Sequence, residues 1–380
     1  MIEALRERAA RAGREAAPAL ERLQDVEEQA RGALAAVAGA GLTAFTVPAR
    51  DGGAAADGLA REDEVSVRAL CALRNELAYH HGMLDVMLAM QGLGSYAVAR
   101  GGAPKLRADV LPDVAAGRAV AAFALTEPGA GSSLADVATT AVRSTAGWRL
   151  TGRKTFISNV PIARFYTLLA RTSGAPGDKD GLSMFFVPGD AWGLDVEPFE
   201  VMAPHPIGDL VLQDCDVPRE FLLGDEGRGL ELALAVLARF RTSVAAAAAG
   251  FARRALDESR RHLASRTQFG KPLSANQGLR FDLAEMDTRL RAAELLVDEA
   301  ARLSDEGDAA APHAVARAKL FATEAAGFIC DRAVQHFGGL GVKRGVAVER
   351  LFREVRALRI YEGTSEVQKL IIAREVLGAD

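Results

Sequence analysis

Cysteine is scarce in this sequence. The 380 residues include only Cys71, Cys215 and Cys330, which lie more than a hundred positions apart and form no CxxC pair. An odd number of widely spaced cysteines argues against a disulfide framework and against a zinc site. The six histidines are also scattered, and His80-His81 lacks a third ligand at helical spacing. We therefore expect no metal site, and the cysteine usage favours a reducing, cytoplasmic compartment.

Long apolar runs are also missing. The longest, Ala245–Ala252, is too short and too rich in alanine to cross a bilayer. The N-terminal segment mixes Arg and Ala with Glu and has no apolar core of the kind found in signal peptides. We therefore expect neither membrane insertion nor a targeting peptide.

No charge of one sign dominates the chain. It has 46 Lys and Arg against 50 Asp and Glu, a net charge of −4, which gives no electrostatic reason to expect nucleic acid as a partner. Hydrophobic residues make up 49% and charged residues 25%, as in globular proteins, so intrinsic disorder and collagen-like repetition are excluded. A chain of this length suggests two or three domains.

Three compositional zones follow one another along the chain, at residues 1–118, 119–224 and 225–380. The first shows helical periodicity, with helices expected around 61–80 and 83–99. The second has short β-rich runs punctuated by Gly, Pro, Asp and Ser, which indicates a small sandwich or barrel. Those runs are Ala119–Leu125, Val137–Arg143, Trp148–Thr151, Thr155–Ile157, Phe165–Ala170, Leu182–Val187 and Asp209–Gln213.

Long helical segments return in the third zone. Four are expected, at 227–264, 273–304, 311–337 and 345–377, the last interrupted near Gly363. Their short connections indicate an up-and-down four-helix bundle. Strands and helices do not alternate, which argues against a doubly wound parallel sheet. We predict an α+β multidomain fold: an N-terminal all-α domain, a central β domain and a C-terminal bundle.

Glycine-rich loops occur twice, and neither completes a dinucleotide fingerprint. Gly129-Ala130-Gly131 has Leu134 at the place of the third glycine, and Gly339-Leu340-Gly341 has Arg344 there. Neither is placed between a strand and a helix of a βαβ unit, so a Rossmann site is rejected. Glycine turns nevertheless expose backbone N–H groups that can hold a pyrophosphate.

Five short motifs together are far more specific than either loop. They are Thr126–Ser132 (TEPGAGS), Lys154–Asn159 (KTFISN), Arg266–Lys271 (RTQFGK), Gln335–Gly339 (QHFGG) and Ile360–Glu366 (IYEGTSE). In these motifs, their order and their spacing the sequence resembles the acyl-CoA dehydrogenase family of flavoproteins, from about residue 40 to the C-terminus.

The resemblance implies a fold and an activity. Such proteins have a helical domain, a central β-barrel or sandwich and a four-helix bundle, bind FAD without a covalent bond, and form homotetramers as dimers of dimers. They oxidise an acyl-CoA thioester to the trans-2-enoyl thioester and pass the electrons to an electron-transferring flavoprotein. We accordingly expect an FAD-dependent enzyme of fatty acid metabolism that acts on a CH–CH bond.

Cofactor-binding residues carry over from the resemblance position by position. Thr126 and Ser132 match groups that bind the flavin and its pyrophosphate. Phe156 matches an aromatic residue packed on the isoalloxazine, and Ser158 a hydroxyl near its N5. The remaining matches reach a neighbouring subunit's FAD or lie beside the adenosine diphosphate: Arg266, Gln268, Phe269, Gln335, Gly338 and Gly339 for the first, Thr364 and Glu366 for the second.

Glu362 matches the catalytic base. Removing an α-proton from a thioester needs a carboxylate of raised pKa held against the substrate. Some relatives place the base at the position filled here by Phe240, which cannot serve, so Glu362 stands unopposed. Ser132, Arg241 and Gly363 match substrate-binding positions.

Departures from the family pattern leave alternatives open. Ser133 replaces a usual Asp and Phe156 a common Trp, while Ala238 stands where many relatives carry an Asp that contacts CoA. A carrier protein presents only phosphopantetheine, so Ala238 also suits a dehydrogenase acting on an acyl group tethered to an acyl or peptidyl carrier protein. An oxidase and a flavin-binding relative without dehydrogenation remain further alternatives.

Overall fold

The structure is a computed structural model that describes residues 1–56, 58–145 and 147–378. The chain forms two compact units. The sheet unit comprises Met1 with residues 14–66 and 86–240, and the helical unit comprises residues 2–13, 67–85 and 241–380. Three helices pass from one unit into the other, namely α1 (Ile2–Leu20), α4 (Gly82–Gly101) and α6 (Gly229–Ser265). The expected domain boundaries near residues 118 and 224 stay predictions.

Two helices belong wholly to the sheet unit, α2 (Val26–Gly39) and α5 (Pro104–Ala115). The side chain of Asp25 caps α2 by accepting the N–H of Glu28 at 2.8 Å. Pro104 occupies the first position of α5, where a missing N–H costs nothing. The sequence analysis missed α5. Four 3₁₀ turns lie in the same unit: η1 (Thr43–Thr46), η2 (Ala49–Asp51), η3 (Leu134–Asp136) and η4 (Arg219–Phe221).

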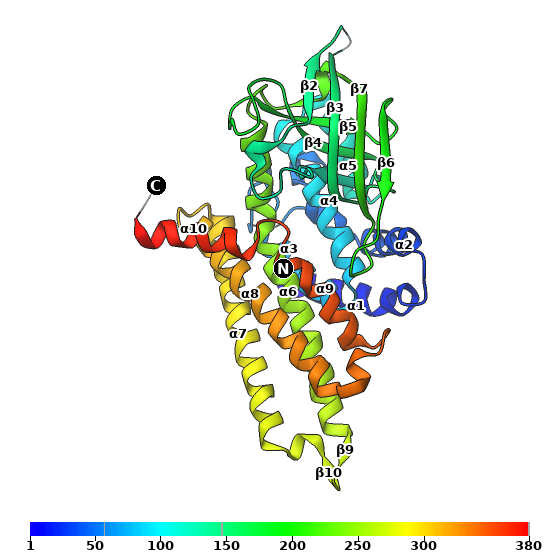
Figure 1. The fold of residues 1–380 in the computed structure, drawn as a ribbon, viewed down its shortest axis with the longest axis vertical. Coiled ribbons are helices and arrows are strands. Elements are labelled where there is room, and N and C mark those ends of the chain that lie inside the picture. The colour runs from blue at the N-terminus through cyan, green and yellow to red at the C-terminus, as the bar shows by residue number, and fades with distance from the viewer. Residues whose placement is uncertain (57, 146, 379–380) are drawn as a thin grey trace. The chain divides into compact units, whose positions relative to one another are not determined.

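An eight-stranded sheet forms the centre of this unit (Figure 1). Its path runs β6-β7-β3-β2-β4-β5-β8, and β1 pairs with β4. The β1–β4 pairing and the single β2–β4 pair are parallel, and the other pairings are antiparallel. The strands are β1 (Ala121–Ala124), β2 (Thr140–Arg143), β3 (Gly147–Ser158), β4 (Phe165–Arg171), β5 (Leu182–Pro188), β6 (Leu194–Pro198), β7 (Ile207–Pro218) and β8 (Leu222–Leu223).

Strands form where the sequence predicts β-rich runs, but several of their bounds differ from the prediction. The two runs Trp148–Thr151 and Thr155–Ile157 are one strand, β3, because β7 pairs along most of its length. Strands β6 and β8 were missed; β6 is charged and largely exposed, so it lacks the apolar alternation that marks a strand. The core beneath the sheet includes Trp148, whose ring meets that of Phe185 edge-on at 5.4 Å.

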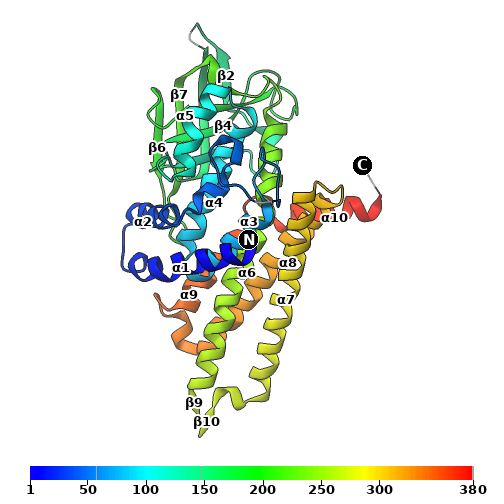
Figure 2. The ribbon, with the colours of Figure 1, turned by 180° about the vertical axis from the view of Figure 1, so that it is seen from behind.

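The helical unit is built around α6, α7 (Gln277–Glu306) and α8 (Ala311–Phe337), which Figure 2 shows running side by side. Its other elements are α3 (Val67–His80), α9 (Ala347–Leu358), α10 (Ser365–Leu377), the short hairpin β9 (Thr267–Gln268) and β10 (Lys271–Pro272), η5 (Leu273–Ala275) and η6 (Gly338–Val342). Alanines dominate the core, among them Ala245–Ala249 of α6, so helix axes can approach closely. Residues 311–337 form the helix that the sequence predicts.

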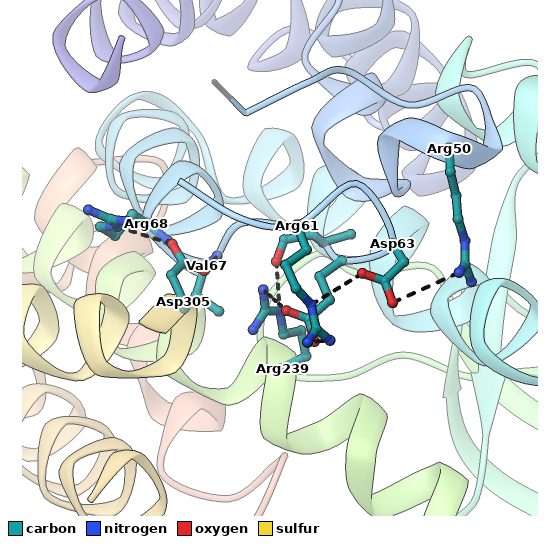
Figure 3. Close-up of polar contacts among 9 residues, drawn as sticks. Arg50, Arg61, Asp63, Val67, Arg68, Arg239 and Asp305 are labelled. Atoms are coloured by element: carbon teal, nitrogen blue, oxygen red, sulfur yellow. Dashed lines mark hydrogen bonds and ion pairs between the residues drawn. The ribbon is translucent and has the colours of Figure 1, made fainter. Parts of the chain in front are cut away.

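The expected helix at 61–80 begins only at Val67. Asp305 of α7 accepts the backbone N–H groups of Val67 and Arg68 at 2.7 and 3.1 Å and also pairs with the Arg68 guanidinium (Figure 3). A carboxylate that takes the first free N–H groups of a helix fixes its N-terminus there.

The residues just before α3 belong to the sheet unit and form a charged loop instead of a helical turn. Asp63 lies between the guanidinium groups of Arg61 and Arg50, at 3.3 and 3.9 Å (Figure 3). The carbonyl of Val65 accepts a hydrogen bond from Arg239 at 2.6 Å. These side-chain contacts stabilise a turn in residues 61–66, which the N–H of Glu64 closes by donating to Arg61 O at 3.0 Å, and the local sequence does not reveal it.

The expected last helix, 345–377, is two helices. Helix α9 ends at Leu358, and α10 starts at Ser365 and lies across the direction of α7 and α8 (Figures 1 and 2). The break is wider than the single interruption predicted at Gly363, and it carries the YEG motif.

Helix α6 corrects the expectation about apolar length. It contains an 18-residue window of mean hydropathy 1.5, which by length and composition alone would suffice to cross a membrane. Of that window 61% is buried inside the protein, as in the core helix of a globular fold.

Close packing of α3 on α6 generates the first prediction. A Cβ added at Gly250 would lie 2.1 Å from the carbonyl oxygen of Asn75, and the Asn75 amide donates to Ala246 O at 3.0 Å. We expect Gly250→Val to lower the free energy of unfolding by about 1–3 kcal/mol, because the two backbones must separate. Thermal unfolding measures the loss. Gly278→Ala, where nothing lies within 4 Å, is the matched control and should leave Tm unchanged or slightly raised.

Candidate active site

The segment between α9 and α10 has an unusual backbone. Glu362 has φ 51° and Gly363 has φ 92°, so two consecutive residues lie in the left-handed region. That region is unfavourable for a glutamate and persists only where neighbours enforce it. The N–H of Tyr361 bonds to Ala357 O at 3.1 Å, and the side chain of Thr364 caps α10. We call residues 359–364 the glutamate loop.

The carboxyl group of Glu362 lies in a dry environment. Although the residue as a whole is half-buried, its Oε2 is buried and has no hydrogen-bond partner among the described residues. Burial raises the pKa of this carboxyl, and the positive charges of Arg74, Arg241 and Lys319 oppose that rise. A carboxylate that is only partly compensated is a stronger base than one in water.

Three side chains hold the carbonyl groups of the glutamate loop. Arg241 of α6 donates its Nε to Glu362 O at 2.9 Å. Lys319 of α8 and Gln368 of α10 both donate to Gly363 O, at 2.6 and 2.9 Å. Since these donors come from three helices, the loop conformation is set by the packing of the helical unit.

Two other acids of the helical unit, Asp85 and Glu354, differ in how their charge is compensated. Asp85 receives both Arg74 Nε and Nη2, at 2.7 and 2.8 Å, and Arg74 Nη1 donates to Ser243. This buried pair is internally compensated. Glu354 of α9 differs, since burial raises the pKa of its carboxyl to about 7. It is therefore a rival to Glu362 as a base, one that sequence reasoning missed.

A second group of predicted residues lies at the far end of α6. Arg266 directly follows Ser265, the last residue of α6, which lies about 36 Å along the helix axis from Arg241 at 1.5 Å per residue. Phe269, at the tip of the β9–β10 hairpin, is 96% exposed. The rings of His262 and Phe337 stack at 4.1 Å, which brings the end of α8 to the same place.

The helical unit therefore splits its predicted residues between two places. Glu362, Gly363, Arg241, Thr364 and Glu366 lie in or beside the glutamate loop. The hairpin and the end of α8 lie away from it, and all their predicted residues are exposed: Arg266, Gln268, Phe269, Gln335, Gly338 and Gly339. Such exposure suits residues that serve a neighbouring subunit, which stays a prediction.

Four predicted residues lie in the sheet unit. Lys154 pairs with Leu210 and Ile157 with Gly208, so β3 has one extra residue in a β-bulge. In this bulge Phe156 takes φ 55° and is 61% exposed, with its ring edge-on to Phe199 at 5.2 Å. A bulge re-aims a side chain, here an aromatic face turned outward.

The loop carrying Thr126 is tied to the bulge by a buried ion pair. Lys154 Nζ lies 2.7 Å from Glu127 Oε1 and donates to Leu125 O at 3.0 Å. Burial raises the pKa of Glu127, but the charge of Lys154 and further hydrogen bonds outweigh it, so the net pKa is lowered. The N–H of Thr155 donates to Thr126 O at 2.9 Å.

Ser158 has a partner that the sequence did not suggest. Its Oγ lies 2.7 Å from Nε2 of His205, and burial lowers the pKa of that imidazole to about 4. His205 is therefore neutral at physiological pH and can either donate to or accept from the Ser158 hydroxyl.

These residues suit a flavin nucleotide. A Cβ at Gly129 or Gly131 would meet nothing within 4 Å, and Ser132 beside them is exposed, so backbone N–H groups there are open to an anion. The exposed Phe156 ring offers a flat apolar surface, and Ser158 a hydroxyl. Backbone N–H groups suit the phosphates of a dinucleotide, and an apolar ring with a nearby hydroxyl suits its ring system.

Phe240 is fully buried in the sheet unit. Its ring contacts Gly92 and meets Tyr96 edge-on at 5.7 Å. This is the position at which some relatives place the base, and the phenylalanine here supplies no carboxylate.

Lys319 and Gln368, which both donate to Gly363 O, were not among the residues that the sequence analysis singled out. Lys319 lies on the face of α8 that buries Ala316, Ala322 and Thr323. A lysine on a core-facing stripe is the one signal that could have found it.

Comparison with known proteins identifies the family and the fold. Residues 2–118, 122–215 and 227–377 match the N-terminal, middle and C-terminal domains of acyl-CoA dehydrogenases. The chain is 38% identical over 311 residues, 81% of each protein, to a cyclohexane-1-carbonyl-CoA dehydrogenase of Geobacter metallireducens. It is 36% identical to a 3-(aryl)acrylate reductase of Clostridium sporogenes, covering 89% of this chain and 88% of that protein.

Solved structures agree. A glutaryl-CoA dehydrogenase in complex with glutaryl-CoA superposes with a TM-score of 0.92 at 28% identity, covering 100% of this chain and 95% of the other. The FAD complex of PigA gives a TM-score of 0.86 at 25% identity, covering 98% and 97%. The class is thus an FAD-dependent oxidoreductase with N-terminal helices, a central sheet and a C-terminal helical domain. The chain belongs to the acyl-CoA dehydrogenase family.

The crowding at Gly363 generates a prediction for the site. A Cβ there would lie 2.5 Å from Gln368 Nε2, at a φ of 92°. We expect Gly363→Ala to lower the rate of flavin reduction at least tenfold, because displacement of the loop misplaces the carboxylate. Stopped-flow absorbance measures the rate.

Gly345→Ala is the matched control, since Gly345 has φ 89° and nothing within 4 Å of an added Cβ. It imposes the same backbone strain without the collision and should keep most of the activity. Equal losses in the two variants would mean that backbone strain, and not the hold on the loop, limits activity.

Proposed function

We propose that this protein catalyses the α,β-dehydrogenation of an acyl-CoA thioester with Glu362 as the base. The observation that carries the proposal is the buried, unpartnered Oε2 of Glu362 in a strained loop, with a pKa raised by burial. A structural glutamate would be expected to pair with a nearby cation, since Arg241 and Lys319 both lie beside the loop. Here those cations bind backbone carbonyls, and the carboxylate keeps a free oxygen.

Proton removal is the step for which this chain supplies the chemistry. Glu362 takes the α-proton of the thioester, and its dry surroundings keep it basic. The acceptor for the β-hydrogen, as hydride, would be supplied by FAD when it is bound. The backbone N–H of Glu362 has no acceptor among residues 1–56, 58–145 and 147–378. It is free to polarise the thioester carbonyl as negative charge develops on that oxygen.

FAD contacts are proposed for residues of each unit. In the sheet unit Phe156 stacks on the flavin, Ser158 contacts its ring, and Thr126 and Ser132 bind the flavin and pyrophosphate. In the helical unit Thr364 and Glu366 bind the adenosine diphosphate. Ser132, Arg241 and Gly363 are proposed to contact the substrate, and Arg241 also holds the carbonyl of Glu362.

The decisive experiment compares two glutamates. Glu362→Gln keeps the shape and removes the base, so we expect anaerobic flavin reduction by the best acyl-CoA to fall by at least about 10²–10⁴-fold. FAD content and ligand binding should be retained. Stopped-flow bleaching of the flavin gives the rate.

Glu354→Gln is the matched control, because Glu354 is the other buried glutamate with a raised pKa. It should react at close to the wild-type rate. Loss of activity in Glu354→Gln, together with reduction at more than about a tenth of the wild-type rate in Glu362→Gln, would assign the base to Glu354.

Electron transfer, assembly and compartment complete the proposal. We infer that the electrons pass to an electron-transferring flavoprotein and that the enzyme is a homotetramer of the cytoplasm in fatty acid metabolism. Helix α10 supports assembly, since Leu370, Val376 and Leu377 are 61–78% exposed. The buried, unpaired state of Cys71, Cys215 and Cys330 supports a reducing compartment.

A second candidate is a substrate tethered to a carrier protein, favoured by Ala238. This residue is exposed on α6 and has no group with which to contact CoA. The acyl-CoA proposal predicts that free CoA and carrier thioesters of the same acyl group have kcat/KM values within about tenfold.

The tethered substrate predicts instead a much larger kcat/KM on the carrier, with Ala238→Asp improving the CoA ester alone. Initial rates with both substrates and both variants decide between the two. The resemblance to a 3-(aryl)acrylate reductase also makes the reverse reaction worth assaying with the same variants.

A further inference from the structure

Lys319 is a buried cation that the proposed chemistry does not use. The residue is 0% exposed, and its ammonium donates to Gly363 O at 2.6 Å. On α8 it follows the buried Ala318 and precedes the buried Ala322. A lysine in such surroundings is costly unless its charge is compensated. Alanines occupy most of the neighbouring buried positions of α8, so a lysine at this position is unusual.

Charges from several elements face this ammonium. Burial is the largest cause that lowers the pKa of Lys319, and the charge of Arg241 of α6 acts in the same direction, so that the net pKa is about 8. Glu362 of the glutamate loop, Glu324 of α8 and Glu366 of α10 raise it. Among these acids Glu324 is engaged with Ser365 at 2.6 Å and with Arg359 at 3.2 Å. Glu366 is exposed, so water screens its charge.

Glu362 and Lys319 therefore influence one another directly. Lys319 is one of three cations that oppose the rise in the pKa of Glu362. The other two have further partners, since Arg74 forms the bidentate pair with Asp85, and Arg241 donates to the carbonyl of Glu362 itself. Lys319 is the cation that binds the carbonyl of the residue next to the base.

We propose that Lys319 is a positioning residue for Glu362, which holds the left-handed Glu362–Gly363 pair through Gly363 O and keeps the carboxylate ionised in its buried place. This inference rests on the proposed role of Glu362 as the base. It adds that a residue of α8 affects the pKa of the base and that a buried side chain of the helical unit fixes the conformation of the glutamate loop.

Substitution of Gln368 separates the effect of the hydrogen bond to Gly363 O from the effect of the charge of Lys319. Its Nε2 donates to the same oxygen, Gly363 O, and the residue is also 0% exposed, but it carries no charge. Gln368→Met therefore removes one hydrogen bond to the loop and leaves the electrostatics unchanged. Lys319→Met removes a hydrogen bond and a charge together, and Lys319→Arg keeps both.

The experiment measures two quantities in the FAD-loaded enzyme. The first is the pH dependence of kcat/KM, whose acidic limb reports protonation of the base. The second is the pKa of Glu362, obtained from the infrared carboxyl band that disappears in Glu362→Gln. The second readout does not depend on turnover.

Loss of a cation disfavours the ionised carboxylate, so Lys319→Met should raise the pKa of Glu362 by about one unit and move the acidic limb to higher pH by the same amount. The value of kcat at the optimum should fall about tenfold. Lys319→Arg should restore the limb and most of kcat. Gln368→Met should lower kcat without moving the limb.

Several results would overturn the inference. An unchanged infrared pKa in Lys319→Met, or an equal shift in Gln368→Met, would show that Lys319 has no electrostatic role. Unchanged kcat in both variants would show that neither bond holds the loop. If Lys319→Met fails to retain FAD or to unfold cooperatively, Lys319→Gln removes the charge while keeping a donor, and the same pKa shift is required of it.

Failure of the proposed function would look different. If Glu362 is not the base, Glu362→Gln still reduces the flavin at the wild-type rate, and the acidic limb does not follow the infrared pKa. The shift of that pKa in Lys319→Met would remain measurable.

Discussion

Hydrogen bonds to two consecutive carbonyl groups determine where the carboxylate of Glu362 lies. Arg241, Lys319 and Gln368 bring these donors from α6, α8 and α10, at 2.6–2.9 Å. A left-handed glutamate is stable only where its neighbours outweigh the backbone strain. The alanine-rich core of the helical unit is therefore part of the site, because it fixes the three helices that supply the donors.

Electrostatic balance at Glu362 follows from how those donors are used. Cations that met the carboxylate directly would hold its pKa low and make it a poor base. Arg241 and Lys319 bind backbone oxygens, and Arg74 is bound to Asp85, so their charges act on Glu362 only at a distance. Burial then dominates, and the pKa of Glu362 is raised. The same arrangement leaves Oε2 free for a proton.

In the sheet unit, a β-bulge and a buried ion pair place the residues proposed to contact FAD. A β-bulge turns Phe156 outward at φ 55°, and the buried pair of Lys154 and Glu127 joins the bulge to the loop of Thr126. The two segments are joined by this buried ion pair, by the bond from Lys154 to Leu125 O and by the backbone bond from Thr155 to Thr126 O. Breaking such a pair strands a buried charge, so both segments depend on it.

The helix at 311–337, most of the strands and the motifs that carry Phe156 and Glu362 could be predicted from the sequence, because periodicity and motif spacing are local properties. Other features depend on tertiary contacts. Helix α3 starts at Val67 because Asp305, distant in the sequence, takes its first N–H groups. The role of Lys319 is equally invisible along the chain, since its partner is a carbonyl 44 residues away. Contacts between residues distant in the sequence determine these features, and a local sequence pattern does not show which distant residue will make such a contact.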